Sequence, residues 1–198
     1  MRWFRPALLP AALLVAACSQ PAAQGSDWQL DAGASALNFV SIKSGSIAET
    51  HHFGDISGTV AGDGTAELVI GLASVETGIE IRNARMQEHF FETGNYAEAR
   101  LTAQIDLAAL TGLEPGERTT IPLEGTLDLH GASLPVATEV TVTDLNGERV
   151  LVETAAPIFL HVEDFGLADG LATLQELAGL PSITPVVPVT ASLVFERQ

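Results

Sequence analysis

Alternation of apolar and polar residues is the feature that most constrains the fold of this chain. In the segment 100–110, apolar and polar residues change places at every step from Leu101 to Leu107. A period of two places all the apolar side chains on one face of a β-strand. Further segments that we interpret as strands are 28–31, 36–43, 47–60, 65–72, 119–130, 136–143, 149–161 and 185–197. Turn sequences such as Asn146-Gly147 separate them.

These segments predict a mainly β domain of about eight antiparallel strands, with no alternation of strands and helices. Strands with one apolar face must either stack as two sheets or close into a barrel, and closure removes exposed edges. Gly54 and Gly58 interrupt the segment 47–60 and suggest bends. Two short helices are expected, at 80–91 and 168–180. The periodicity leaves open whether side chains fill the barrel or a ligand does.

Composition narrows the class of function. The chain has 198 residues, 46% of them apolar and 17% charged, which is typical of one folded domain with a sizeable core. Its formal charge is -16, so the surface repels phosphate backbones and we expect no nucleic-acid partner.

The N-terminal residues resemble a bacterial lipoprotein leader. Arg2 and Arg5 precede the apolar run Ala7–Val15, which is too short to span a bilayer comfortably. The single cysteine, Cys18, follows small residues where a lipid would be attached. We therefore expect a signal peptide at 1–17, a lipidated cysteine and flexible tether at 18–26, and the domain at 27–198. The alternative is an ordinary secretory signal with a chance cysteine.

Four stretches resemble the YceI-like family, small bacterial proteins with a lipocalin-like barrel. They are Trp28–Asp31, Ser74–Phe91, Leu127–Gly131 with Pro135-Val136, and Asp164–Leu167. Three positions depart from the family pattern: Asn83 replaces an acidic residue, Arg85-Met86 replaces His-Leu, and Tyr96-Ala97 replaces Tyr-Pro.

The resemblance implies a single eight-stranded antiparallel barrel, with one or two short helices near its mouth, that holds an isoprenoid lipid of quinone or polyprenyl type. The expected ligand-binding residues are Leu37, Phe39, Arg82, Met86, Phe90, Phe91, Ile105, Leu127, Leu129, Phe159 and Phe165. Arg82 and Arg85 are candidates for contacts with a lipid head group; the alternative is that they pair with surface carboxylates. The resemblance of the N-terminal residues to a lipoprotein leader implies a periplasmic protein anchored through Cys18, and Ser19 after it favours the outer membrane. The family resemblance implies a possible homodimer.

Residue patterns for catalysis or metal binding are weak. Glu88-His89 and His161 with Glu163 offer pairs of ligands, but no spacing assembles three. The chain has no G-x-S-x-G elbow and no Cys–His pair. We expect no enzyme, no catalytic residue, no metal and no cofactor beyond a bound lipid or quinone. Two alternatives stay open: a filled barrel whose acidic surface binds a partner, and an enzyme acting on a bound lipid or amide.

Overall fold

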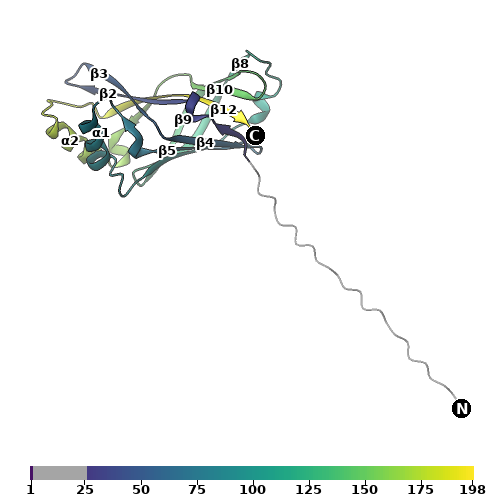
Figure 1. Ribbon diagram of the computed structural model, residues 1–198, viewed down its shortest axis with the longest axis horizontal. Coiled ribbons are helices and arrows are strands. Elements are labelled where there is room, and N and C mark those ends of the chain that lie inside the picture. The colour runs from purple at the N-terminus through teal and green to yellow at the C-terminus, as the bar shows by residue number, and fades with distance from the viewer. Residues whose placement is uncertain (2–25) are drawn as a thin grey trace.

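The computed structural model describes Met1 and residues 26–198, which form a barrel (Figure 1). The predicted signal peptide and Cys18 lie outside the described residues. The strands are β1 (Ser26–Leu30), β2 (Ala36–Lys43), β3 (Ile47–Phe53), β4 (Ile56–Ala61), β5 (Thr65–Gly71), β6 (Val75–Glu76), β7 (Glu98–Gln104), β8 (Arg118–Leu129), β9 (Ala132–Asp144), β10 (Arg149–Thr154), β11 (Ile158–His161) and β12 (Val186–Arg197). The helices are α1 (Glu80–Arg85) and α2 (Ala168–Leu177), with short turns η1 (Ala32–Ala34), η2 (Leu72–Ser74), η3 (Met86–Phe90), η4 (Leu107–Leu110) and η5 (Val162–Phe165).

These strands build the closed antiparallel barrel of eight that the sequence predicts. The order β1-β4-β5-β7-β8-β9-β10-β12 returns to β1 through pairs such as Trp28 with Arg197. The remaining strands extend four of these eight strands at one end of the barrel: β2 follows β1, β3 precedes β4, β6 follows β5 and β11 follows β10. Strands that are neighbours in the barrel are thus also consecutive in the sequence, as in an up-and-down barrel.

Bends divide the longer predicted strands. The segment 47–60 breaks at Gly54-Asp55, as the glycine suggests, where Gly54 N and Asp55 N donate to Ser74 O and Ser74 Oγ. Gly58, in contrast, lies within β4 and marks no break. A side chain would not fit there, because its Cβ would lie 2.9 Å from Glu67 O. The predicted strand 100–110 is wrong beyond Gln104, where the chain turns into η4 with Asp106 accepting a hydrogen bond from Ala108 N.

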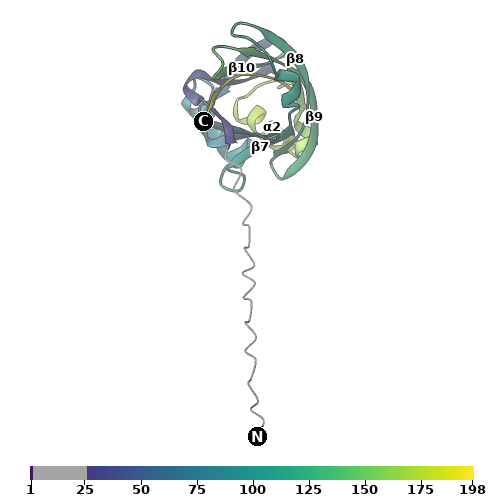
Figure 2. The same ribbon diagram turned by 90° about the vertical axis from the view of Figure 1, so that its right-hand side faces the viewer.

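The two helices lie together at one end of the barrel (Figure 1). Gly170 of α2 touches η3 so closely that a Cβ would meet His89 O at 2.5 Å, which explains the absence of a side chain there. Figure 2 looks along the barrel from the opposite end, and α2 is seen through the ring of strands. None of the helices in the described residues is long and apolar enough to cross a membrane. The barrel therefore has a helical end, bearing α1 and α2, and a loop end, bearing the termini of the domain.

Candidate functional site

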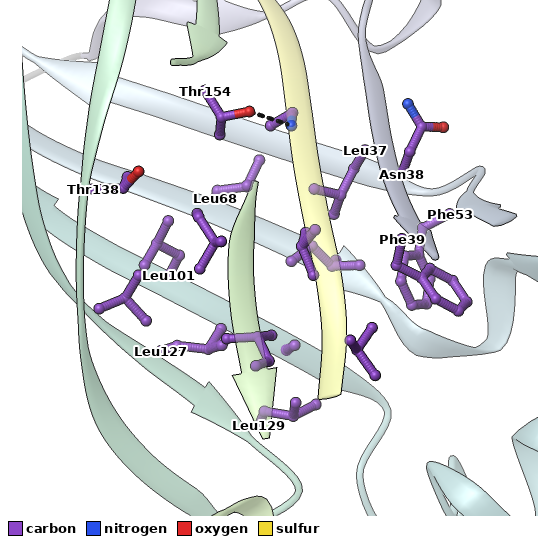
Figure 3. Close-up of a pocket in the computed structure, with 18 of the residues that line it drawn as sticks. Leu37, Asn38, Phe39, Phe53, Leu68, Leu101, Leu127, Leu129, Thr138 and Thr154 are labelled. Carbon is purple, nitrogen blue, oxygen red and sulfur yellow. Dashed lines mark hydrogen bonds between the residues drawn. The ribbon is translucent and has the colours of Figure 1, made fainter. Parts of the chain in front are cut away.

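An apolar cavity of about 200 Å³ lies inside the barrel toward its helical end. Three of its lining residues, Asn38, Thr138 and Thr154, are polar, and none is charged. Figure 3 shows Leu68, Leu101, Leu127 and other leucines converging on this space. Such a surface offers few hydrogen bonds to water, so it favours an apolar occupant.

A second cavity of about 570 Å³ lies toward the loop end. Its wall includes charged and aromatic groups as well as apolar ones. Asp144 is buried and accepts a hydrogen bond from Gly147 N at 2.6 Å. Arg197 lies over the ring of Trp28, with its guanidinium carbon 4.5 Å from the ring centroid. This cavity can hold the polar part of an amphipathic molecule.

The two cavities meet along the barrel axis. Six side chains line both of them: Leu68, Leu101, Leu123, Val140, Val152 and Leu193. They come from six strands and form a neck between the two spaces. Together the cavities fall within the range of about 300–1,000 Å³ that is usual for small-molecule sites. The interior therefore holds two adjoining cavities, apolar at the helical end and mixed at the loop end.

Aromatic rings close the helical end. Phe90 and Phe91 from η3 and its C-cap are buried, with ring centroids 4.9 Å apart. Phe91 reaches Phe53 at 5.7 Å, and Phe53 reaches Phe39 at 5.3 Å. Edge-to-face and tilted contacts at these distances add to the energy of burial.

Most predicted binding residues converge on these cavities. The first is lined by Leu37, Phe39, Phe90, Phe91, Leu127, Leu129 and Phe165, and the second by Ile105. Met86 is buried beside them but lines neither cavity. Phe159 is on the other face of its strand: Ile158 and Leu160 line the first cavity, whereas Phe159 is 61% exposed. The prediction followed the residue type and overlooked the alternation, which places Ile158 and Leu160 inside and Phe159 outside.

Arg82 and Arg85, considered above as contacts for a lipid head group, instead bind groups of the protein itself. Arg82 donates to Glu49 Oε2 at 2.8 Å and to Thr77 O at 2.7 Å, and Lys43 lies 2.6 Å from the same carboxylate. Hydrogen bonds from Lys43 and Arg82 lower the pKa of Glu49 below its ordinary value. Arg85 donates to Leu177 O. Both arginines hold the helical end together and neither lines a cavity.

Asn83, which departs from the family pattern, anchors the start of α1. Its Oδ1 accepts hydrogen bonds from Thr77 N at 2.9 Å and Thr77 Oγ1 at 2.6 Å. An amide oxygen therefore does what a carboxylate could do at this position, without adding charge to an acidic protein.

Two histidines have structural roles that their surroundings explain. His130, with φ 51°, and Gly131, with φ 79°, form the two-residue turn between β8 and β9, the type that needs positive φ at both positions. His130 Nδ1 lies 3.2 Å from Phe165 O, which can accept but not donate, so this nitrogen carries the proton.

His51 was not singled out by the sequence, and it is 2% exposed. Its Nε2 shares a hydrogen bond of 2.8 Å with Ser41 Oγ, and its ring lies 5.1 Å from that of Phe39. Burial, together with nearby Arg82, lowers the pKa of His51. Among the described residues, no group of three or more His, Cys, Asp and Glu side chains could hold a metal ion.

Fold and site together define a class: an antiparallel β-barrel with a ligand-sized apolar interior, of lipocalin type. The sequence profile of the YceI-like domain matches residues 28–195, and the chain belongs to this family. A polyisoprenoid-binding domain from Saccharophagus degradans, implicated in plant cell wall breakdown, is 41% identical, with a TM-score of 0.86 over 88% of this chain and 100% of that one.

More distant structures share the fold. BcnA of Burkholderia cenocepacia is 19% identical, with a TM-score of 0.66 over 83% of this chain and 98% of that one. A YceI protein of Campylobacter jejuni is 14% identical, with a TM-score of 0.55 over 75% and 84%. Curated proteins yield no significant match.

Proposed function

We propose that this protein binds an isoprenoid lipid, of quinone or polyprenyl type, with the tail inside the barrel. The observation that carries the proposal is the pair of adjoining cavities, of which the inner one, of about 200 Å³, has no charged residue in its wall. The relative from Saccharophagus degradans, described as polyisoprenoid-binding, supports the same class of ligand.

Physical chemistry explains why such a lipid needs a carrier. Each methylene moved from water to an apolar site gains about 0.8 kcal/mol, so a five-carbon isoprene unit gains roughly 3–4 kcal/mol. A tail of several units is therefore essentially absent from free solution. We propose that the protein works in the periplasm as a carrier or store, held to the outer membrane through Cys18.

The rival reading, a filled barrel that serves as an interaction module, is disfavoured by the two cavities. Side chains do meet across the helical end, but two cavities of about 200 and 570 Å³ remain inside the barrel. An acidic outer surface is compatible with either function.

A fluorescence titration tests the proposal. Trp28 lines the second cavity, and the other tryptophan, Trp3, belongs to the predicted leader. A prenylated benzoquinone should quench Trp28 saturably, whereas the same head group without a tail should not. Leu123→Phe, which narrows the neck, should weaken binding by about tenfold, if it costs about 1.4 kcal/mol of ligand contact.

Leu177→Phe on α2, where Leu177 is 42% exposed, is the matched control and should bind normally. Equal affinity for the tailed and tailless quinones, or no saturable quenching at all, would contradict the proposed function.

A further inference from the structure

The hydrogen-bonded wall of the barrel is interrupted between residues 132–138 of β9 and β11 (Ile158–His161). We call this interruption the seam. β9 pairs with β10 as far as Val140 and Thr154, and one more bond follows, from Ala155 N to Glu139 O at 2.9 Å. Beyond it, β9 pairs with β8 alone and β11 pairs with β12 alone. By contrast, at this end β2 pairs with both β12 and β3, β3 also pairs with β6, and β8 pairs with β9 as far as Leu129 and Ala132.

The backbone hydrogen bonds of the β9–β10 ladder show which residues on each strand face the neighbouring strand. Ala155 N donates to Glu139 O, and at the hairpin Leu145 N donates to Arg149 O. In an antiparallel ladder, bonded pairs recur at every second residue on each strand. The bonded positions of this ladder are therefore the odd-numbered residues, in pairs whose register the 139–155 contact extends.

Proline removes a donor from each edge of the seam. Pro135 is one of the odd-numbered residues of β9, and Pro157 lies in the link between β10 and β11. This link also holds two extra residues, because Val152 pairs with Leu193 on β12 whereas Ile158 pairs with Val189. The β9–β10 register therefore ends at the link, and prolines, which have no N–H to donate, disfavour a new ladder beyond it. The sequence itself therefore favours the seam. Along residues 132–138 of β9 it is about 20 Å long, at about 3.3 Å per residue.

The seam runs beside the apolar cavity. Val136 and Thr138 on β9 and Ile158 and Leu160 on β11 all line the first cavity and are only partly buried. Phe159 adds an exposed apolar ring on the outer face of β11. An apolar chain lying along the seam would therefore touch apolar side chains both outside and inside the wall.

Neither end of the barrel offers an apolar tail an equivalent path. Phe90, Phe91 and Phe165 are buried at the helical end and close it. At the loop end, a tail entering first would pass the buried carboxylate of Asp144 and the charged Arg197. Charged groups are costly to strip of water beside an apolar chain.

We propose that the seam is the side portal through which the apolar tail slides into and out of the cavity. Opening it breaks no ladder hydrogen bond, because the two strands have none to break there. The proposal rests on the proposed function, since it concerns how the lipid reaches its site.

Cross-linking across the seam tests the portal, with Cys18→Ser in every variant. Ala137→Cys with Phe159→Cys places two exposed thiols on opposite sides of the seam, and a cleavable bis-maleimide joins them. The control is Thr141→Cys with Glu153→Cys, a pair already joined in the ladder. The readout is the rate at which a prenylated benzoquinone, delivered from phosphatidylcholine vesicles, quenches Trp28.

Cross-linking the seam should slow quenching by more than about tenfold without changing its final extent, and cleaving the linker should restore the rate. The cross-linked control should keep the original rate. Equal slowing in both, or in neither, would overturn the portal while leaving the proposed function intact. No quenching in any variant, with the wild type included, would overturn the proposed function and the portal together.

Hydrogen exchange provides a measurement that needs no ligand. The amides of Ala137 and Phe159 should exchange much faster than those of Thr141 and Glu153, which are paired in the β9–β10 ladder. Equal protection of the four amides would show a closed seam in solution and would also overturn the portal.

Discussion

The helical end and the loop end of the barrel are built by opposite means. At the helical end, aromatic rings from η3, β2 and β3 pack against one another and leave a cavity of about 200 Å³. At the loop end, a single 3₁₀ turn and hairpin loops cover a cavity of about 570 Å³ with charged groups in its wall. The comparison teaches that stability is concentrated at one end, which leaves the other free to accommodate a polar group.

The largest expected effect is on stability at the helical end. Phe91→Ala should lower the free energy of unfolding by about 3–5 kcal/mol, because it removes a buried ring and leaves a cavity. Ile105→Ala, at the loop end, should cost less than about 2 kcal/mol, because its side chain already borders empty space. Urea denaturation measures both.

Phe159→Ala provides the surface control and should change the free energy of unfolding by less than about 0.5 kcal/mol. Similar losses for Phe91→Ala and Ile105→Ala would contradict the contrast between the two ends.

A smaller effect should follow from the anchor of α1. Asn83→Ala removes the acceptor of two hydrogen bonds from Thr77 and should lower the free energy of unfolding by about 1–2 kcal/mol. Asn83→Asp keeps an acceptor and should recover most of the stability. If both substitutions cost the same, the hydrogen bonds are not what the residue contributes.

The smallest expected effect is a pH dependence that also belongs to the helical end. Because burial lowers the pKa of His51 in the folded protein, the unfolded chain binds its proton first as the pH falls. Stability should therefore be full above the ordinary histidine value of about 6.5 and decline as the pH falls below it. The decline should end once the pH passes the lowered folded-state pKa.

His51→Gln should flatten this part of the stability curve, whereas His161→Gln, at an exposed position, should leave it unchanged. The measurement is the midpoint of urea denaturation across a pH series. An unchanged slope in the His51 variant would assign the pH dependence to other groups.

Much of this architecture could be predicted from sequence, because alternation reports directly which face of a strand is buried. β2 has the predicted bounds, and β8 and β12 differ from theirs by one residue at most at each end. The error at Phe159 was also avoidable from the sequence. Even-numbered residues face the cavities on both sides of the break at Pro157, namely Val152 and Thr154 before it and Ile158 and Leu160 after it, so alternation alone places Phe159 outside.

Other features depend on the tertiary structure and could not be predicted. Glu49 lies far from Arg82 in sequence, so the pairing that draws Arg82 away from the cavity appears only once β3 and α1 are placed together. The cavities inside the barrel could not be predicted for the same reason, because they too depend on the tertiary structure. Alternation identifies the inner face of each strand, but the volume left between those faces depends on how all the strands close.

The most direct test is to ask what occupies the barrel when the protein comes from its own membranes. The full chain is purified under gentle conditions, and mass spectrometry is applied to the intact protein and to its organic extract. We expect an isoprenoid lipid that copurifies in stoichiometric amount and is released when the protein unfolds. Repeated preparations with no isoprenoid, in protein that also fails to take one up from vesicles, would contradict the assignment.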